Sequence, residues 1–195
     1  PEYNLHTVKE SGKHVQEVHA REITHRLDAL KRVDLFAGMS AQELQTISER
    51  LVFAPFAKGD VITRQGAVAH WLYILTAGDA EVVVDQPGGE RRVVSTLPSG
   101  TCFGEMGLLT GEPRRATVVA ATAVECYRLD KASLEDSLRT RPALAEDFSR
   151  MLVTRQADLD RKLEQADAAQ FTHRSAHEHS EILARIRNFF GLERG

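Results

Sequence analysis

The sequence has few cysteines, no long apolar run and no strong excess of one charge. Cys102 and Cys126 are too few for a disulfide framework and match no metal or redox spacing, which favours a reducing cytoplasm. No run approaches the roughly 20 apolar residues of a membrane-spanning helix, and no signal peptide opens the chain. A formal net charge of −3 argues against general nucleic-acid binding, because that activity usually needs a basic surplus.

The chain is long enough for one main hydrophobic core. It has 195 residues, of which 42% are hydrophobic, so we expect one core with helical attachments. Because the first residue is Pro1 rather than Met, we also expect the chain to be a piece of a longer protein.

Helical patterns occupy the first quarter of the chain. Residues 19–33 carry apolar side chains at the spacing of one helical face. Ser40, followed three residues later by Glu43, forms a capping-box signature before a second apolar pattern. We therefore expect two helices separated by a turn at Gly38. Residues 1 to about 12 show no clear period, which leaves an extended conformation open.

Between about residues 55 and 129, short β-rich runs alternate with turn residues. The sequence from 81 to 97, with glycines at its centre, reads as a hairpin. Many short strands at close spacing favour a barrel, sandwich or roll. The expected strands are 60–63, 71–76, 80–84, 92–97, 116–121 and 124–129.

After residue 130 the period is helical again. We expect a short helix over 131–140 and a long one that begins near Pro142, with an apolar stripe on which Arg155 is the one charged exception. The tail over 171–180 is polar and expected to be mobile. The amphipathic segment 182–192 could pack on the same domain, dock on a neighbouring chain or touch a membrane surface.

The stretch FGEMGLLTGEPRRATV, residues 103–118, combines features of an anion site. Glycines let a backbone approach a ligand closely, a helix start near Gly104 favours an anion, and Arg114 offers a fork of donors to phosphate oxygens. Glu105 would repel phosphate but could accept a hydrogen bond from a sugar hydroxyl. The combination indicates a nucleotide, whereas the alternative is a solvated turn with a surface ion pair.

These residues resemble the phosphate-binding cassette of the cyclic nucleotide-binding domain. The motif consists of Leu97, Gly100 and residues 103–106, separated by two residues each, followed by residues 111–114 and 116–118. The resemblance extends over roughly residues 35–163. The family includes the bacterial catabolite activator and protein kinase A regulatory subunits. The resemblance implies an α+β fold: an antiparallel β-roll (a double-stranded β-helix, jelly-roll-like) flanked by N-terminal helices and a C-terminal lid helix.

The resemblance also implies roles for individual residues. Glu105 would accept the ribose 2′-OH, Arg114 would bind the cyclic phosphate, and backbone N–H groups of the cassette would complete the cradle. Arg115 occupies a position at which relatives that recognise cyclic GMP have Thr. The absence of Thr favours cyclic AMP as the ligand, although cyclic GMP remains open. The candidate ligand-binding residues, the last three of them from the lid, are Val94, Phe103, Gly104, Glu105, Met106, Gly107, Arg114, Arg115, Ala116, Met151, Leu152 and Arg155.

The flanking segments suggest what this module regulates. About 30 residues follow the lid pattern, without two further helices, so we do not expect DNA binding. We expect neither an enzyme nor a catalytic cofactor, because no catalytic signature is present. His173 and His177 have the spacing of a metal pair, but no further ligand completes a site, so we expect no metal.

Residues 1–6 and 184–192 resemble the flanks of bacterial small mechanosensitive-type channels fused to such a domain. On that resemblance we expect ligand binding and lid closure to control gating of an attached channel. The domain would lie in the cytoplasm, the parent protein in the bacterial inner membrane, and the assembly would be a homo-oligomer. The alternatives are a stand-alone sensor, a pocket for another anion, and a scaffold with no ligand.

We expect three regions along the chain. Residues 1–34 form a connector with an N-terminal helix. Residues 35–168 form the cyclic nucleotide-binding domain, with the β-roll over about 55–130 and the hinge and lid helices over 131–168. Residues 169–195 form a polar linker and an amphipathic C-terminal helix.

Overall fold

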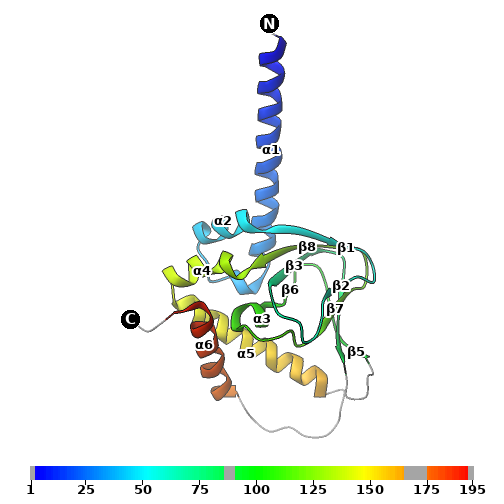
Figure 1. The fold of residues 1–195 in the computed structure, drawn as a ribbon, viewed down its shortest axis with the longest axis vertical. Coiled ribbons are helices and arrows are strands. Elements are labelled where there is room, and N and C mark those ends of the chain that lie inside the picture. Colours follow the sequence, from blue (N-terminus) through cyan, green and yellow to red (C-terminus); the bar gives the residue numbers. More distant parts are fainter. Residues whose placement is uncertain (1–2, 86–90, 165–174, 193–195) are drawn as a thin grey trace.

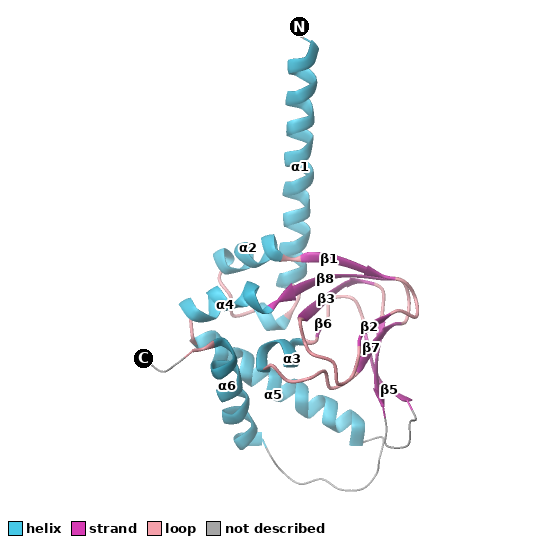
Figure 2. Ribbon diagram, in the orientation of Figure 1, coloured by secondary structure: helices cyan, strands magenta, loops and turns pink. Residues whose placement is uncertain are grey.

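Eight strands form two four-stranded antiparallel sheets in the computed structural model of the chain, which describes residues 3–85, 91–164 and 175–192. One sheet has the order β1-β8-β3-β6 and the other β2-β7-β4-β5. Figure 2 shows the two sheets curling around a common interior. The strands are β1 (Val52–Phe56), β2 (Val61–Thr63), β3 (Trp71–Ala77), β4 (Ala80–Asp85), β5 (Arg91–Leu97), β6 (Cys102–Phe103), β7 (Thr117–Ala120) and β8 (Val124–Asp130).

The sheet that contains β3 is buried on both faces, because alternate residues of a strand point to opposite sides. Leu72 and Ile74 belong to the cluster shared with the helices, whereas Tyr73 and Leu75 belong to the cluster inside the roll. This explains why β3 reads as a continuous apolar run rather than an alternating one.

Helices cover the outer face of that sheet at one end of the roll (Figure 1). The fold is therefore the expected antiparallel β-roll flanked by helices. The helices are α1 (Tyr3–Lys31), the 3-10 turn η1 (Asp34–Phe36), α2 (Ala41–Arg50), α3 (Glu105–Thr110), α4 (Lys131–Thr140), α5 (Ala143–Glu164) and α6 (Ser175–Phe190).

Local sequence signals account for several helix ends. Ser40 caps α2 in the predicted capping box, since the Glu43 backbone N–H donates to Ser40 Oγ (3.3 Å) and the Glu43 carboxylate accepts from the Ser40 N–H (2.6 Å). Asp130 caps α4 by accepting from the Ser133 N–H at 3.0 Å and from its hydroxyl at 2.6 Å.

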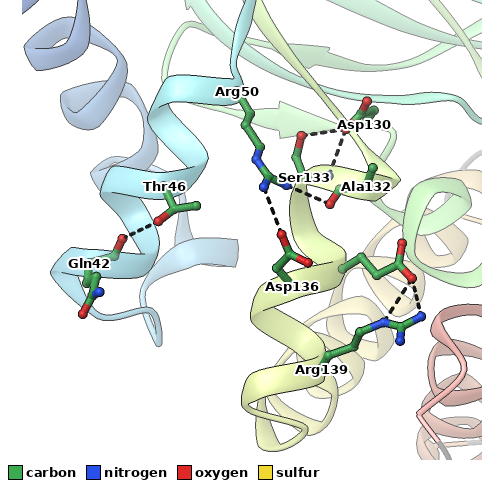
Figure 3. A network of polar contacts seen from close by, with 9 residues as sticks. Gln42, Thr46, Arg50, Asp130, Ala132, Ser133, Asp136 and Arg139 are labelled. Atoms are coloured by element: carbon green, nitrogen blue, oxygen red, sulfur yellow. Dashed lines mark hydrogen bonds and ion pairs between the residues drawn. The ribbon is translucent and has the colours of Figure 1, made fainter.

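An arginine at the end of α2 ties this helix to α4, as Figure 3 shows. Arg50 donates to the Ala132 carbonyl oxygen (3.1 Å) and forms an ion pair with Asp136 (2.9 Å). The N-terminal helices and the helices that follow the roll are thus in direct contact.

Three expectations about elements were wrong or incomplete. The first residues, for which an extended conformation was open, belong to α1, which begins at Tyr3 and stands out from the body as a rod (Figure 1). The β-rich region begins at Val52 rather than near residue 55, with β1 as an edge strand that tolerates Pro55. The two-residue strand β6 was not predicted.

The C-terminal segment packs on the same chain. Ile182, Ile186 and Phe190 of α6 are at most 3% exposed and join the helical core. Of the three roles considered for residues 182–192, the structure therefore supports packing on the same domain. Residues 175–180, expected to be mobile, form the first turns of α6. The preceding linker, including His173, and the hairpin turn at 86–90 lie outside the described residues.

Within the described ranges, none of the helices combines the length and apolar character that a membrane span needs.

Candidate functional site

A cavity of about 440 Å³ opens between the roll, the α3 segment and helix α5. It brings together most of the candidate residues from the sequence. Those that line it are Phe103, Gly104, Glu105, Met106, Gly107, Arg114, Arg115, Ala116 and Arg155. The others in its wall are Thr63, Val82, Ser95, Leu97, Thr101, Val118, Gln156, Asp158 and Leu159.

Gly104 allows the chain to turn from β6 into α3 directly beside Arg114. Its φ of +81° lies in the left-handed region, which favours glycine. A Cβ at this position would collide with Nη1 of Arg114. The glycine therefore serves two needs, the backbone turn and room for the guanidinium.

The guanidinium of Arg114 is buried in the cavity wall, since the residue is only 7% exposed. Nη1 donates to the Gly104 carbonyl oxygen at 2.7 Å, and Nη2 donates to that of Trp71. The same group lies 6.0 Å from the ring centroid of Tyr73. These contacts fix the position of a charged fork at the start of the α3 segment.

Burial lowers the pKa of the Arg114 guanidinium, whereas Tyr73 and Glu105 act in the opposite direction. A guanidinium remains protonated in proteins even so. The cavity wall therefore holds a permanent positive charge that two neutral carbonyl groups do not balance, which suits an anionic ligand.

Glu105, the first residue of α3, points to helix α5 as well as to the cavity. Its side chain is 13% exposed, and its Oε1 lies 3.4 Å from Nη1 of Arg155. Arg155 also donates to the Cys102 carbonyl oxygen at 3.1 Å and pairs with Asp34 of η1. One arginine thus joins the cassette, helix α5 and the segment after α1.

Arg115 follows Arg114 but is more exposed. Its Nη2 lies 3.5 Å from Oε2 of Glu112, and 34% of its side chain is accessible. The backbone of Arg114 is tied to the opposite loop by two hydrogen bonds, from the Arg114 N–H to Ala67 (2.8 Å) and from the Gly66 N–H to Arg114 (2.7 Å).

Three candidate residues lie away from the cavity wall. Leu152 is fully buried in the helical core, and Met151 packs against that core beside η1. Val94 is half-buried on β5, whose Ser95 and Leu97 reach the wall instead.

The residues of α5 that reach the cavity besides Arg155 are Gln156, Asp158 and Leu159. Leu159 belongs to the apolar stripe that the sequence predicts for this helix. Nothing in the sequence distinguishes Gln156 and Asp158 from polar residues on the protein surface.

No group of three or more His, Cys, Asp or Glu side chains suited to a metal occurs among the residues described.

Comparison with known proteins identifies the segment that forms most of this site. Residues 53–141 match the family model of the cyclic nucleotide-binding domain. This segment is similar in sequence to cyclic nucleotide-binding domains. It runs from β1 to the residue after α4, so α1, α2, α5 and α6 lie outside the matched part.

Two curated relatives illustrate the proteins that carry such a domain. The chain is 38% identical over 102 residues to a cAMP-dependent protein kinase regulatory subunit of Blastocladiella emersonii, a match that covers 52% of this chain and 25% of that protein. It is 28% identical over 135 residues to a Rhodopseudomonas palustris protein named as a potassium channel, covering 69% of this chain and 32% of that protein. The chain thus spans about a quarter to a third of these relatives.

Solved structures of the same fold hold different ligands. One is the regulatory subunit of a cAMP-independent protein kinase A from Trypanosoma brucei, a mutant bound to cAMP (TM-score 0.55, 28% identity, 60% of this chain and 43% of that chain). Another, from Trypanosoma cruzi, is bound to guanosine (TM-score 0.56, 28% identity, 61% and 42%). The fold of a cyclic nucleotide-binding domain therefore does not fix the ligand by itself.

Cys102 and Cys126 are both buried, and burial raises the pKa of each thiol to about 12. At pH 8 only about one thiol in ten thousand would be ionised, and the thiolate is the reactive form. We therefore expect both thiols of the folded protein to resist a disulfide reagent at pH 8 and to react rapidly in concentrated guanidinium chloride. Rapid modification of either thiol in the folded protein would contradict the burial of that cysteine.

Proposed function

We propose that this chain is a regulatory module that binds a cyclic nucleotide, with cyclic AMP preferred over cyclic GMP, and that it has no catalytic activity of its own. The observation that carries the proposal is the buried guanidinium of Arg114 at the wall of a cavity that Glu105 also lines. The volume, about 440 Å³, is within the range of small-molecule sites.

The positive charge of Arg114 favours a ligand with a phosphate over a neutral nucleoside. Each terminal nitrogen of a guanidinium carries two N–H groups, and one on each is directed to a backbone carbonyl. The other N–H groups can serve the exocyclic oxygens of a cyclic phosphate, with backbone N–H groups around Gly104 and 115–116 completing the cradle.

The carboxylate of Glu105 supplies the acceptor that a ribose needs. An ionised carboxylate accepts hydrogen bonds and repels phosphate, so a 2′-hydroxyl is its fitting partner in a nucleotide. Cyclic AMP is preferred in this proposal because Arg115 replaces the Thr that accompanies cyclic GMP in relatives. The relatives named as cAMP-dependent kinase subunits support the same choice.

Arg155 offers a route from the ligand to the N-terminal helix. A ribose hydroxyl that bonds to Glu105 changes the surroundings of the Arg155 guanidinium, which also holds Asp34 just after α1. Helix α5 would close over the base with its residues 155–159. A ligand shifts such an equilibrium only by its preference for one of the two states.

We further propose that the parent protein is a membrane channel, in a bacterial inner membrane, that this cytoplasmic module gates as part of a homo-oligomer. Support comes from the resemblance of residues 1–6 and 184–192 to channel flanks and from the relative named as a potassium channel. Helix α1, which extends away from the roll (Figure 1), is suited to connect the module to such a partner. The alternative is a stand-alone sensor or scaffold.

Replacement of Arg114 tests the phosphate contact. We expect Arg114→Ala to weaken cyclic AMP binding by about 10- to 150-fold, the equivalent of about 1.5–3 kcal/mol for a lost charge-assisted hydrogen bond. Calorimetric titration of the wild type and the variant measures it. Arg139→Ala, which removes an exposed arginine of α4 paired with Glu135, is the control and should bind as the wild type does. Equal affinities of the Arg114 variant and the wild type would refute the assignment.

A thermodynamic cycle that combines the substitution Glu105→Ala with removal of the 2′-hydroxyl from the ligand tests the role of Glu105. In the wild type, 2′-deoxy cyclic AMP should bind about 10-fold more weakly than cyclic AMP or worse, because the carboxylate loses its hydroxyl partner. In Glu105→Ala the two ligands should bind almost equally. If deletion of the hydroxyl costs the same in both proteins, Glu105 does not contact the ribose. Unchanged affinity of Glu105→Ala for cyclic AMP would favour a pocket for a different anion.

A further inference from the structure

Helix α6 lies outside the matched domain, yet it packs directly on the cassette. Figure 1 shows it beside α3 and α5. Ile182, Ile186 and Phe190 are buried in the core that also contains Leu108 and Leu109 of α3. The end of the chain and the nucleotide cassette therefore share one hydrophobic cluster.

An aromatic side chain of α6 covers the turn that ends α3. Gly111 caps α3 with a φ of +76°, and a Cβ there would lie 2.8 Å from the ring of Phe189. Lys131 also contacts this ring, with its Nζ 3.7 Å from the ring centroid, and it donates to the Phe189 carbonyl oxygen. The turn at Gly111 opens the loop that leads to Arg114, so Phe189 supports that loop at its first residue.

A chain of charges links α6 to the cavity through the same loop. The carboxylate of Glu112 pairs through Oε1 with Arg185 of α6 and through Oε2 with Arg115, at 3.5 Å. Arg115 lines the cavity. Loop 111–115 is thus held by α6 on one side and by the hydrogen bonds of Arg114 to Gly66 and Ala67 on the other.

We propose that α6 positions loop 111–115 for nucleotide binding, with Phe189 and Arg185 as the positioning residues. The inference rests on the proposed function, because it adds α6 to the same site. A loop that is already ordered loses less conformational freedom when ligand binds, so its affinity is higher. By linkage, nucleotide binding strengthens the docking of α6 by the same factor.

Two arginines of α6 provide a matched test. Arg185 pairs with Glu112 of the cassette loop, whereas Arg187 pairs with Glu146 of α5 at 3.2 Å. Each substitution by Gln removes one cation from the same helix, and Arg185→Gln also removes a 3.9 Å ion pair with Glu181 of α6 itself. We expect Arg185→Gln to weaken cyclic AMP binding by about two- to fivefold in calorimetric titration. Arg187→Gln should leave the affinity within about 1.5-fold of the wild type, because its partner lies away from the loop.

Further variants separate positioning from general stability. Arg185→Lys retains the charge and should recover part of the lost affinity, and Phe189→Ala should weaken binding more than Arg185→Gln does. Melting temperatures should fall to a similar extent in Arg185→Gln and Arg187→Gln, so a loss of affinity confined to the first is not explained by stability. Equal affinities of these two variants, or tighter binding by Arg185→Gln, would overturn the proposal.

Hydrogen–deuterium exchange without ligand keeps the two proposals distinguishable. Amides of residues 111–116 should exchange faster in Arg185→Gln than in Arg187→Gln or the wild type. Failure of the wild type to bind cyclic AMP or cyclic GMP would refute the proposed function, whereas the exchange result would still report on the loop. Identical exchange of these amides in all three proteins would show that α6 does not position the loop.

Discussion

The candidate site depends on one buried positive charge. The guanidinium of Arg114 is held by the carbonyl groups of Gly104 and Trp71, which belong to the α3 segment and to β3. To keep this charge there, the chain must supply a glycine at 104, a ring face at Tyr73 and a loop tied to residues 66–67. The burial of a charge is costly unless polar groups surround it, and a pocket that holds such a charge is suited to an anion.

A second arginine connects this pocket to the rest of the molecule. Arg155 contacts Glu105, Cys102 and Asp34, which come from α3, β6 and η1. Its neighbours on α5 line one side of the cavity, and α6 contacts the loop that leads to Arg114. Thus two helices beyond the matched domain, α5 and α6, both contact the segment that we propose as the nucleotide cassette. Regulation by a ligand requires such contacts, because its binding must favour one arrangement of the helices.

Local features of the fold were predictable from sequence because they depend on neighbouring residues. The capping box at Ser40, the helix over 131–140 and most strands follow from cap chemistry, turn residues and periodicity. Strand β1 was not among the predicted strands, because Pro55 is unusual in a strand and is tolerated here only at the edge of the sheet. Helix α1 was missed over its first turns, where no apolar period marks it.

The cassette residues 103–107 and 114–116 could be selected from sequence since they form a contiguous motif, and the structure gathers them at one cavity. Residues from distant elements could not be chosen so well. The apolar stripe of α5 includes residues of the core and of the cavity wall, so it does not reveal which residues meet the cavity and which, like Leu152, meet the core. The pairing of Arg155 with Asp34 and that of Arg185 with Glu112 join positions far apart in sequence, and no local pattern encodes such pairs.

A crystal structure of the chain grown with cyclic AMP tests the central claim most directly. The account predicts a nucleotide in the cavity between α3 and α5, with its exocyclic phosphate oxygens about 2.7–3.2 Å from nitrogens of Arg114 and its ribose 2′-hydroxyl on Glu105. A nucleotide bound outside this cavity, or one whose phosphate lies away from Arg114, would contradict the account.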